Sequence, residues 1–385
     1  MGKEMIMDTV FLGDKDNDQL NIKIRLGNLI AQELAQPTAD SARRDILTEI
    51  HQVLNSDKTT NNISERENFK FSISPQELHW LEKHDQTKWI EYIIYRYKFK
   101  IFPSQRKLLD FPLYLLIEPT SVCNLNCVMC FQADKTFRTK EFMGMMDWEL
   151  FKKIADEAKQ NNCHAITLAS RGEPTLHPDF GRMLKYLFDL GILDVKINTN
   201  ATRLTDSIIH DILAAQVSEC VFSVDAATKE TYEEIRVGGK FEEVVANVKR
   251  FKEIREKHYP NSPTVTRIAG VKIRPDQDEK QMSEFWSALV DEVVIKSAAP
   301  RWDTYNNEAV GLTDPCSRLW RQMYVWYDGK VNPCDFDYKS YLSVGDVNNN
   351  SIKEIWLGEK FSQLRHDHLN QARNKYVPCD RCPLV

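Results

Sequence analysis

The sequence predicts an α/β fold in which parallel strands alternate with amphipathic helices. Between Phe111 and about Ser297, short apolar runs typical of buried strands are separated by stretches of helical periodicity. This alternation indicates βαβ units whose sheet is covered on both faces. In such folds the chemistry gathers where the strands end, so the following loops are the first place to look for a site. The expected strands begin near Leu113, Ala165, Val195, Val221, Thr266 and Val293.

Three cysteines follow the first expected strand at the spacing C-x3-C-x2-C: Cys123, Cys127 and Cys130. Three thiolates at this spacing suit three corners of a 4Fe–4S cube and leave the fourth iron without a protein ligand. An open coordination position is the usual mark of a reactive metal site. Zinc is the alternative, but it normally takes four ligands, and no fourth Cys or His lies close by in the sequence.

The cysteine spacing resembles that of the radical S-adenosylmethionine (radical SAM) superfamily. The resemblance implies that the open iron binds the amino and carboxylate groups of S-adenosylmethionine, and that reduction cleaves this molecule to a 5′-deoxyadenosyl radical. It also implies a partial (β/α)6 barrel, TIM-like but open on one side. A flavodoxin or ferredoxin is the implied reductant.

Downstream residues extend the resemblance in the family's order. Arg171-Gly172-Glu173-Pro174 follows the second expected strand, where the family has a G-G-E-P-like element, with Arg171 in place of the first Gly. Gly172 would let the backbone approach the ligand, and Glu173 would accept from the methionine ammonium. Arg236 would clamp the methionine carboxylate, with a surface ion pair as the alternative. The remaining candidates for cofactor contacts are Pro174, Asn200, Ser223 and Asp225.

A second cysteine set near the C-terminus predicts an auxiliary 4Fe–4S cluster. Cys316, Cys334, Cys379 and Cys382 are spaced C-x17-C-x44-C-x2-C, and Cys334 closes a turn from Gly329 typical of a β-hairpin. Four ligands would satisfy a cluster completely, while a zinc ribbon is the alternative. The segment 345–365 resembles the linking helix of SPASM and twitch domains. A full SPASM domain has seven cysteines, and this chain stops three residues after Cys382, so the single-cluster twitch type is favoured.

The chain of 385 residues exceeds what one core usually holds and divides into three expected segments. Residues 1–110 are expected to form a mostly helical, partly flexible extension, 111–297 the barrel and 298–385 the small cluster-binding domain. A capping box at Ser74–Glu77 predicts a helix start there. An aromatic and aliphatic stripe from Trp80 to Ile94 is expected to pack, and the polar stretch 36–68 to be a loosely held helix with linkers.

Composition narrows the partners and the compartment. A net charge of −5 without a basic stripe argues against nucleic-acid binding, and no apolar run reaches the length of a membrane span. Nine cysteines in a chain without a secretory signal indicate metal sites in a reducing cytoplasm.

Basic residues near the last two strands suggest how a substrate binds. In Val271-Lys272-Ile273-Arg274 the side chains alternate, so the apolar pair is expected to face the helices and the basic pair the interior. Cations facing a cavity are costly unless they meet an anion or perform chemistry. Lys296 ends the last strand and would join them. Arg301, Trp302 and Tyr305 would rim the same mouth, unless they are ordinary loop residues. Such a mouth suits a phosphorylated or nucleotide sugar, a cyclitol or an acidic peptide.

Several functions fit these motifs, and a radical dehydrogenase is favoured. It would abstract hydrogen from a carbinol carbon of a sugar, nucleotide sugar or aminocyclitol, with Lys272, Arg274 or Lys296 assisting deprotonation and the auxiliary cluster accepting the electron. A peptide maturase is the second reading, although such enzymes commonly carry a leader-recognition module containing strands. A non-catalytic electron carrier would leave the G-E-P element without purpose. An epimerase would need a thiol facing the substrate, whereas Cys163 and Cys220 are expected at the far end of the barrel as buried hydrophobes.

Overall fold

The computed structural model describes residues 8–11, 16–37, 40–55, 71–298 and 303–384. The chain divides into two compact units: Gly13–Leu109 forms one, and Met1–Leu12 joins Asp110–Val385 in the other. The expected barrel and the expected cluster-binding segment therefore belong to a single unit. Among the described residues, no helix has both the length and the apolar character needed to cross a membrane.

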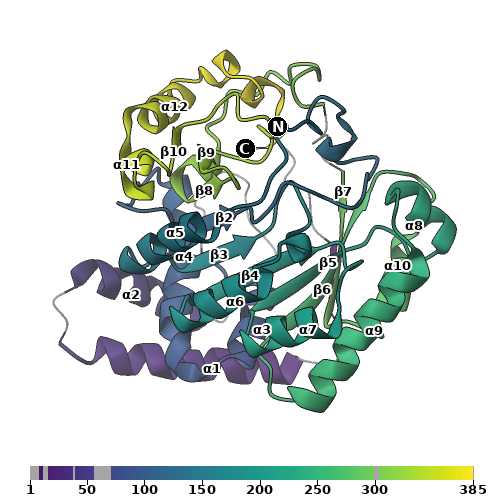
Figure 1. Ribbon diagram of the computed structural model, residues 1–385. Coiled ribbons are helices and arrows are strands. Elements are labelled where there is room, and N and C mark those ends of the chain that lie inside the picture. Colours follow the sequence, from purple (N-terminus) through teal and green to yellow (C-terminus); the bar gives the residue numbers. More distant parts are fainter. Residues whose placement is uncertain (1–7, 12–15, 38–39, 56–70, 299–302, 385) are drawn as a thin grey trace. The chain divides into compact units, whose positions relative to one another are not determined.

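The larger unit is built on one sheet with the strand order β1-β7-β6-β5-β4-β3-β2-β8-β9-β10 (Figure 1). Its centre confirms the six predicted strands, which pair in parallel with their neighbours. These are β2 Tyr114–Ile117, β3 Ala165–Leu168, β4 Asp194–Thr199, β5 Glu219–Ser223, β6 Val265–Lys272 and β7 Glu292–Ser297. Because β1 and β10 stand at opposite ends of this order, the sheet is open, as the partial barrel requires.

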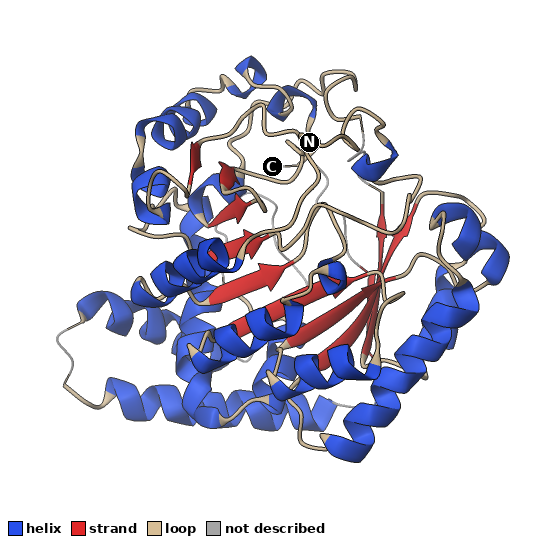
Figure 2. Ribbon diagram, in the orientation of Figure 1, coloured by secondary structure: helices blue, strands red, loops and turns tan. Residues whose placement is uncertain are grey.

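Helices cover the outer face of this sheet (Figure 2). Many begin at a side chain that accepts from the first turn, such as Asp147 before α5 and Thr205 before α7. Alternate strand residues, including Leu115, Ile166 and Ile197, pack with these helices in one apolar core. The helices are α5 Trp148–Gln160, α6 Phe180–Asp189, α7 Asp206–Ala214, α8 Lys229–Ile235, α9 Phe241–His258 and α10 Glu279–Ser287.

Strands from distant parts of the sequence extend the sheet on both sides. β1 Asp8–Phe11 pairs antiparallel with β7, so these residues belong to the sheet and not to the helical extension expected from residue 1. β8 Gln322–Val325 pairs parallel with β2, and it forms with β9 Lys330–Asn332 the hairpin predicted around Gly329. β10 Gly345–Asp346 follows. The helices α11 Ile352–Leu357 and α12 Glu359–Leu369 come after it.

The smaller unit contains helices and no strand among its described residues, with α1 Asp16–Leu34, α2 Ser41–Asn55, α3 Pro75–Lys83 and α4 Trp89–Ser104. The predicted capping box is confirmed, because the Ser74 side chain accepts from the amide of Glu77 and the Glu77 carboxylate accepts from the amide of Ser74. The aromatic stripe is packing, with the ring centroids of Trp80 and Tyr92 stacked 3.6 Å apart. Of the polar stretch 36–68, residues 41–55 form α2, and 56–68 lie outside the described residues.

Candidate active site

The loop after β2 brings Cys123, Cys127 and Cys130 together. Two backbone hydrogen bonds fix the loop to the residues around the end of α8. The amide of Asn126 donates to the carbonyl of Val237 at 2.8 Å, and a second amide of the loop donates to another carbonyl of the same segment. Burial is the main cause that raises the pKa of the Cys123 thiol to about 12, and the neighbouring Cys127 and Cys130 contribute to the rise. The three thiols therefore lie near one another on one loop, as the three-ligand site predicted from the spacing requires.

Only a glycine fits at position 172, because the backbone there lies against the Cys123 loop. A side-chain β-carbon at this position would lie 2.3 Å from the carbonyl oxygen of Thr120 and 2.5 Å from that of Val122. The amide of Glu173 donates to Val122 O at 2.9 Å, which ties the turn to the loop. A close backbone approach is present at Gly172, and the segment that it meets is the loop that carries Cys123.

Glu173 is a buried carboxylate with capacity for a cation. Its Oε1 accepts from the hydroxyls of Thr175 at 2.6 Å and Thr199 at 2.7 Å, whereas Oε2 accepts the amide of Asn200 at 2.6 Å. Burial raises the pKa of Glu173, and these hydrogen bonds act against the rise. An ionised carboxylate accepts about four hydrogen bonds, so Oε2 retains room for an ammonium donor.

The other expected cofactor residues lie around the same loop. The side-chain nitrogen Nδ2 of Asn200 donates to Asn124 Oδ1 at 3.0 Å and lies 3.9 Å from Cys123 Sγ. Pro174 begins the short turn that follows Glu173, and Ser223 is the last residue of β5.

Arg236 makes a buried ion pair and not the surface pair considered as its alternative. Its Nε lies 2.5 Å from Asp225 Oδ2, with side-chain exposures of 11% and 0%. The other Asp225 oxygen accepts the amide of Val271 at 2.8 Å, and Arg236 Nη1 lies 3.9 Å from Cys127 Sγ. This pair therefore connects the ends of β5 and β6 to the cysteine loop.

The expected inward direction of Lys272 and Arg274 is wrong. Lys272 shares a face of β6 with Ile268, which packs in the helix-facing core, and its amine pairs with Glu279 of α10 at 2.9 Å. Arg274 lies beyond the strand, where it bonds Asp276 and Glu234 in a partly exposed position. Both cations already have carboxylate partners on the outer side.

Lys296 has the opposite placement. On β7 the helix-facing residues are Val293 and Ile295, so Lys296 projects from the other face near the strand's end. Tyr305 is half-buried and donates to Asp337 at 2.8 Å in the cluster-binding segment. Arg301 and Trp302 lie outside the described residues.

Sequence reasoning missed the use of Arg171 and Glu118. Both are fully buried, with Nε of Arg171 2.7 Å from Glu118 Oε2 and Nη2 2.5 Å from Oε1. The only local signal was a charged residue, Glu118, at the end of an apolar strand. The departure from the family's G-G-E-P element is thus a structural ion pair.

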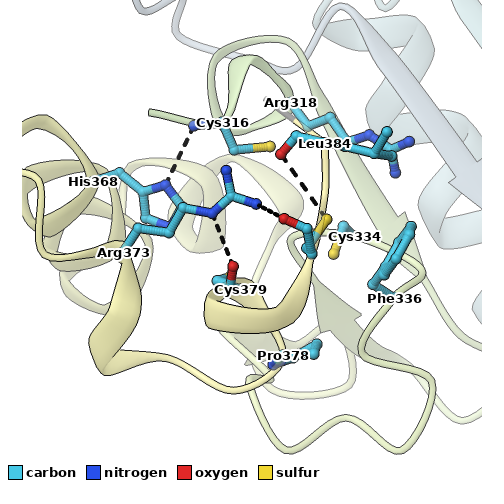
Figure 3. Close-up of a pocket in the computed structure, with 10 residues that line it drawn as sticks. Cys316, Arg318, Cys334, Phe336, His368, Arg373, Pro378, Cys379 and Leu384 are labelled. Atoms are coloured by element: carbon cyan, nitrogen blue, oxygen red, sulfur yellow. Dashed lines mark hydrogen bonds between the residues drawn. The ribbon is translucent and has the colours of Figure 1, made fainter. Parts of the chain in front are cut away.

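The second cysteine set lines one cavity (Figure 3). Cys316 and Cys334 point into the same space there, and Cys379 and Cys382 complete its wall. Arg373 braces the C-terminal pair, because it donates to the carbonyl of Cys379 at 2.9 Å and to that of Cys382 at 2.7 Å.

The chemistry of this cavity fits an iron–sulfur cluster. Arg318 and Arg373 are among its lining residues, and none of the ten is acidic, so cations face the negative charge that four thiolates bring. Burial raises the pKa of the Cys334 thiol to about 12; binding a metal therefore has to release protons. Among the described residues, no three His, Cys, Asp or Glu side chains surround the position of a single metal ion.

The two remaining cysteines are core residues. Cys163 precedes β3 and Cys220 is the second residue of β5, with exposures of 5% and 0%. Both belong to the helix-facing core. Their burial away from the carboxyl ends of the strands matches the expectation that they are small hydrophobes.

Comparisons with known proteins agree with this geometry. The Radical SAM superfamily matches residues 117–285, and the SPASM iron–sulfur cluster-binding domain matches residues 316–383. The tungsten-containing aldehyde ferredoxin oxidoreductase cofactor-modifying protein of Pyrococcus furiosus is 26% identical over 323 residues, covering 70% of this chain and 87% of that protein. Mycofactocin maturase MftC of Mycobacterium tuberculosis is 31% identical over 137 residues, or 36% of this chain and 34% of the maturase.

Among solved structures, Streptococcus suis SuiB bound to precursor peptide SuiA has a TM-score of 0.54 at 15% identity, covering 86% of this chain and 84% of SuiB. At that identity the likeness shows the fold alone. The chain belongs to the radical SAM superfamily and carries a SPASM-type cluster-binding domain. Its cofactors are S-adenosylmethionine with its 4Fe–4S cluster, together with auxiliary iron–sulfur ligation.

Proposed function

We propose that this enzyme oxidises an alcohol of a polar small molecule such as a sugar, a nucleotide sugar or an aminocyclitol. When bound, the first cluster and S-adenosylmethionine supply the radical that abstracts hydrogen from carbon, and the auxiliary cluster accepts the remaining electron. The observation that carries the proposal is the second cysteine cavity, which four thiols and two arginines line beside a hairpin that continues the core sheet. A site without an open ligand position suits electron transfer better than substrate binding.

The residues of this chain have distinct parts in the proposed reaction. Cys123, Cys127 and Cys130 hold the first cluster, and the second set holds the auxiliary one. Glu173 binds the methionine ammonium through Oε2, where its acceptor capacity remains. Arg236 is neutralised by Asp225 in the structure, so a substrate or methionine carboxylate would have to share it.

Polar groups on the inner face of the sheet support a hydroxylated substrate. Asn198 Oδ1 and the indole nitrogen of Trp326 are buried without a hydrogen-bond partner in the described part of the chain. Both residues lie on the face opposite the helices, because Ile197 and Val325 pack in the helix-facing core. Lys296 lies on the corresponding face of β7. We assign to it one of two roles: it removes the hydroxyl proton of the substrate, or it binds an anionic group of the substrate. Buried polar groups of this kind need a partner, which hydroxyl groups provide.

A peptide substrate is the second candidate, because the maturase and the SuiB complex are among the similar proteins. The described residues of Gly13–Leu109 contain helices only, which differs from a winged-helix recognition module with strands.

The test uses the reconstituted, reduced enzyme with three probes: UDP-glucose, the aminocyclitol 2-deoxy-scyllo-inosamine and a mixed peptide library. The proposal expects a sugar or cyclitol to increase 5′-deoxyadenosine release and to yield a ketone, one for each S-adenosylmethionine consumed. Stimulation by peptides alone would replace it with the maturase function. Incorporation of solvent deuterium at carbon in a redox-neutral product would replace it with epimerisation.

A further inference from the structure

All three guanidinium nitrogens of Arg171 donate hydrogen bonds within the protein. Two of its nitrogens bond the two oxygens of Glu118, and Nη1 donates to the carbonyl oxygen of Tyr338 at 2.8 Å. Its backbone amide also donates to Glu118 Oε2 at 3.1 Å. A planar guanidinium satisfies three acceptors in fixed directions, which a lysine ammonium does not reproduce.

These contacts join parts of the chain with different tasks. Glu118 directly follows β2 and precedes the Cys123 loop, and Arg171 directly precedes the Gly172-Glu173 turn. Tyr338 lies in the loop that follows Cys334, and the amide of Tyr327, on the β8–β9 turn, donates to Glu118 Oε1 at 3.3 Å. One buried ion pair therefore ties the first cysteine loop and the methionine-binding turn to the cluster-binding segment.

Two aromatic rings that contact the Arg171 guanidinium belong to packing clusters that touch the two cysteine sets. The guanidinium carbon lies 4.3 Å from the centre of the Trp326 ring and 5.5 Å from that of Phe137. Phe137 packs with Phe131 and Tyr338 in a cluster that Cys130 contacts. Trp326 packs with Leu116, Ala169 and Tyr324 in a cluster that Cys334 contacts. Arg171 thus stands between the packing shells of the two sets.

We propose that Arg171 is a positioning residue that, held by Glu118, fixes the Tyr338 loop of the auxiliary site against the turn that binds S-adenosylmethionine. Through this contact the ion pair sets the relative placement of the two cysteine sets. The proposal rests on the cofactor roles proposed above for Glu173 and the two cysteine sets, but not on which substrate is oxidised, so a wrong substrate class leaves it standing.

The test replaces Arg171 by Lys and Glu118 by Gln in the reconstituted holoenzyme. Arg255→Lys is the matched control, because Arg255 makes a comparable two-nitrogen pair with Asp291 at the opposite end of the sheet. We expect R171K and E118Q to weaken S-adenosylmethionine binding about 10–100-fold, the range for residues that orient ligand-holding groups. Amide hydrogen exchange in residues 336–344 should quicken. The magnetic interaction between the two clusters, measured by electron paramagnetic resonance, should change.

R255K should lower thermal stability without any of these changes. A purely structural role would make R171K resemble R255K: a lower melting temperature with unchanged S-adenosylmethionine affinity, exchange and cluster coupling. That result in both R171K and E118Q would overturn the proposal. Because E118Q retains the shape of the acid and R171K the charge of the base, a folding failure of one variant leaves the other to decide.

Discussion

Replacing Gly172 by Ala tests whether the close approach of two backbone segments builds the active site. The added methyl carbon would lie 2.3 Å, 2.5 Å and 2.6 Å from backbone atoms of Thr120, Val122 and Ser121. Ordinary contact needs about 3.5 Å, so the turn and the loop have to separate by about 1 Å. Overpacking of this kind costs about 1–3 kcal/mol of unfolding free energy. We expect the upper end, because no flexible side chain can move aside.

The larger effect should be on catalysis, since a displacement of about 1 Å at a reacting geometry costs on the order of 100-fold in rate. The assay is release of 5′-deoxyadenosine by the reconstituted, dithionite-reduced enzyme, with iron content and urea unfolding measured on the same samples. Gly27→Ala is the control: nothing lies within 4 Å of its new methyl group inside α1, so it should gain up to about 1 kcal/mol. A G172A enzyme with normal iron content and normal cleavage would refute the reasoning.

Three further outcomes are expected. Anaerobic reconstitution should give about eight irons per chain, and replacing Cys123, Cys127 and Cys130 together by Ala should leave about four and abolish cleavage, measured by iron analysis and chromatography. Glu173→Gln should weaken S-adenosylmethionine binding about tenfold in calorimetry at unchanged iron content, because a charge-assisted bond to the ammonium is lost. Burial lowers the pKa of His84 from 6.5 to about 4. The unfolded imidazole then takes a proton before the folded one, so the smaller unit should lose about 3 kcal/mol as the pH falls from 6.5 to about 4; hydrogen exchange of residues 71–109 should show this loss, and His84→Gln should remove it.

Local patterns were sufficient for the six core strands and for the capping box at Ser74, because each is encoded in residues near one another in sequence. The direction of β6 was not, since alternation tells which residues share a face but not which face meets the helices. Val271 and Ile268 are both apolar; only the packing of Ile268 in the helix-facing core shows that Lys272 points outward.

Partners far apart in sequence escaped prediction for a related reason. Arg171 and Glu118 are 53 residues apart, and nothing in either neighbourhood announces a buried ion pair. The pairing of β1 with β7 and of β8 with β2 likewise depends on register between distant segments, which periodicity does not encode.

The pairing of β8 with β2 affects how this protein folds during synthesis and how it tolerates truncation. β2 is the first of the six core strands in sequence, yet β8, which follows all six, pairs with its second hydrogen-bonding edge. During synthesis the backbone groups of that edge stay unpaired until β8 has been made, after all six core strands. An open strand edge invites pairing with another chain. Deleting the cluster-binding segment should therefore leave the β2 edge unpaired and make the protein prone to aggregate, and should not yield a smaller active enzyme.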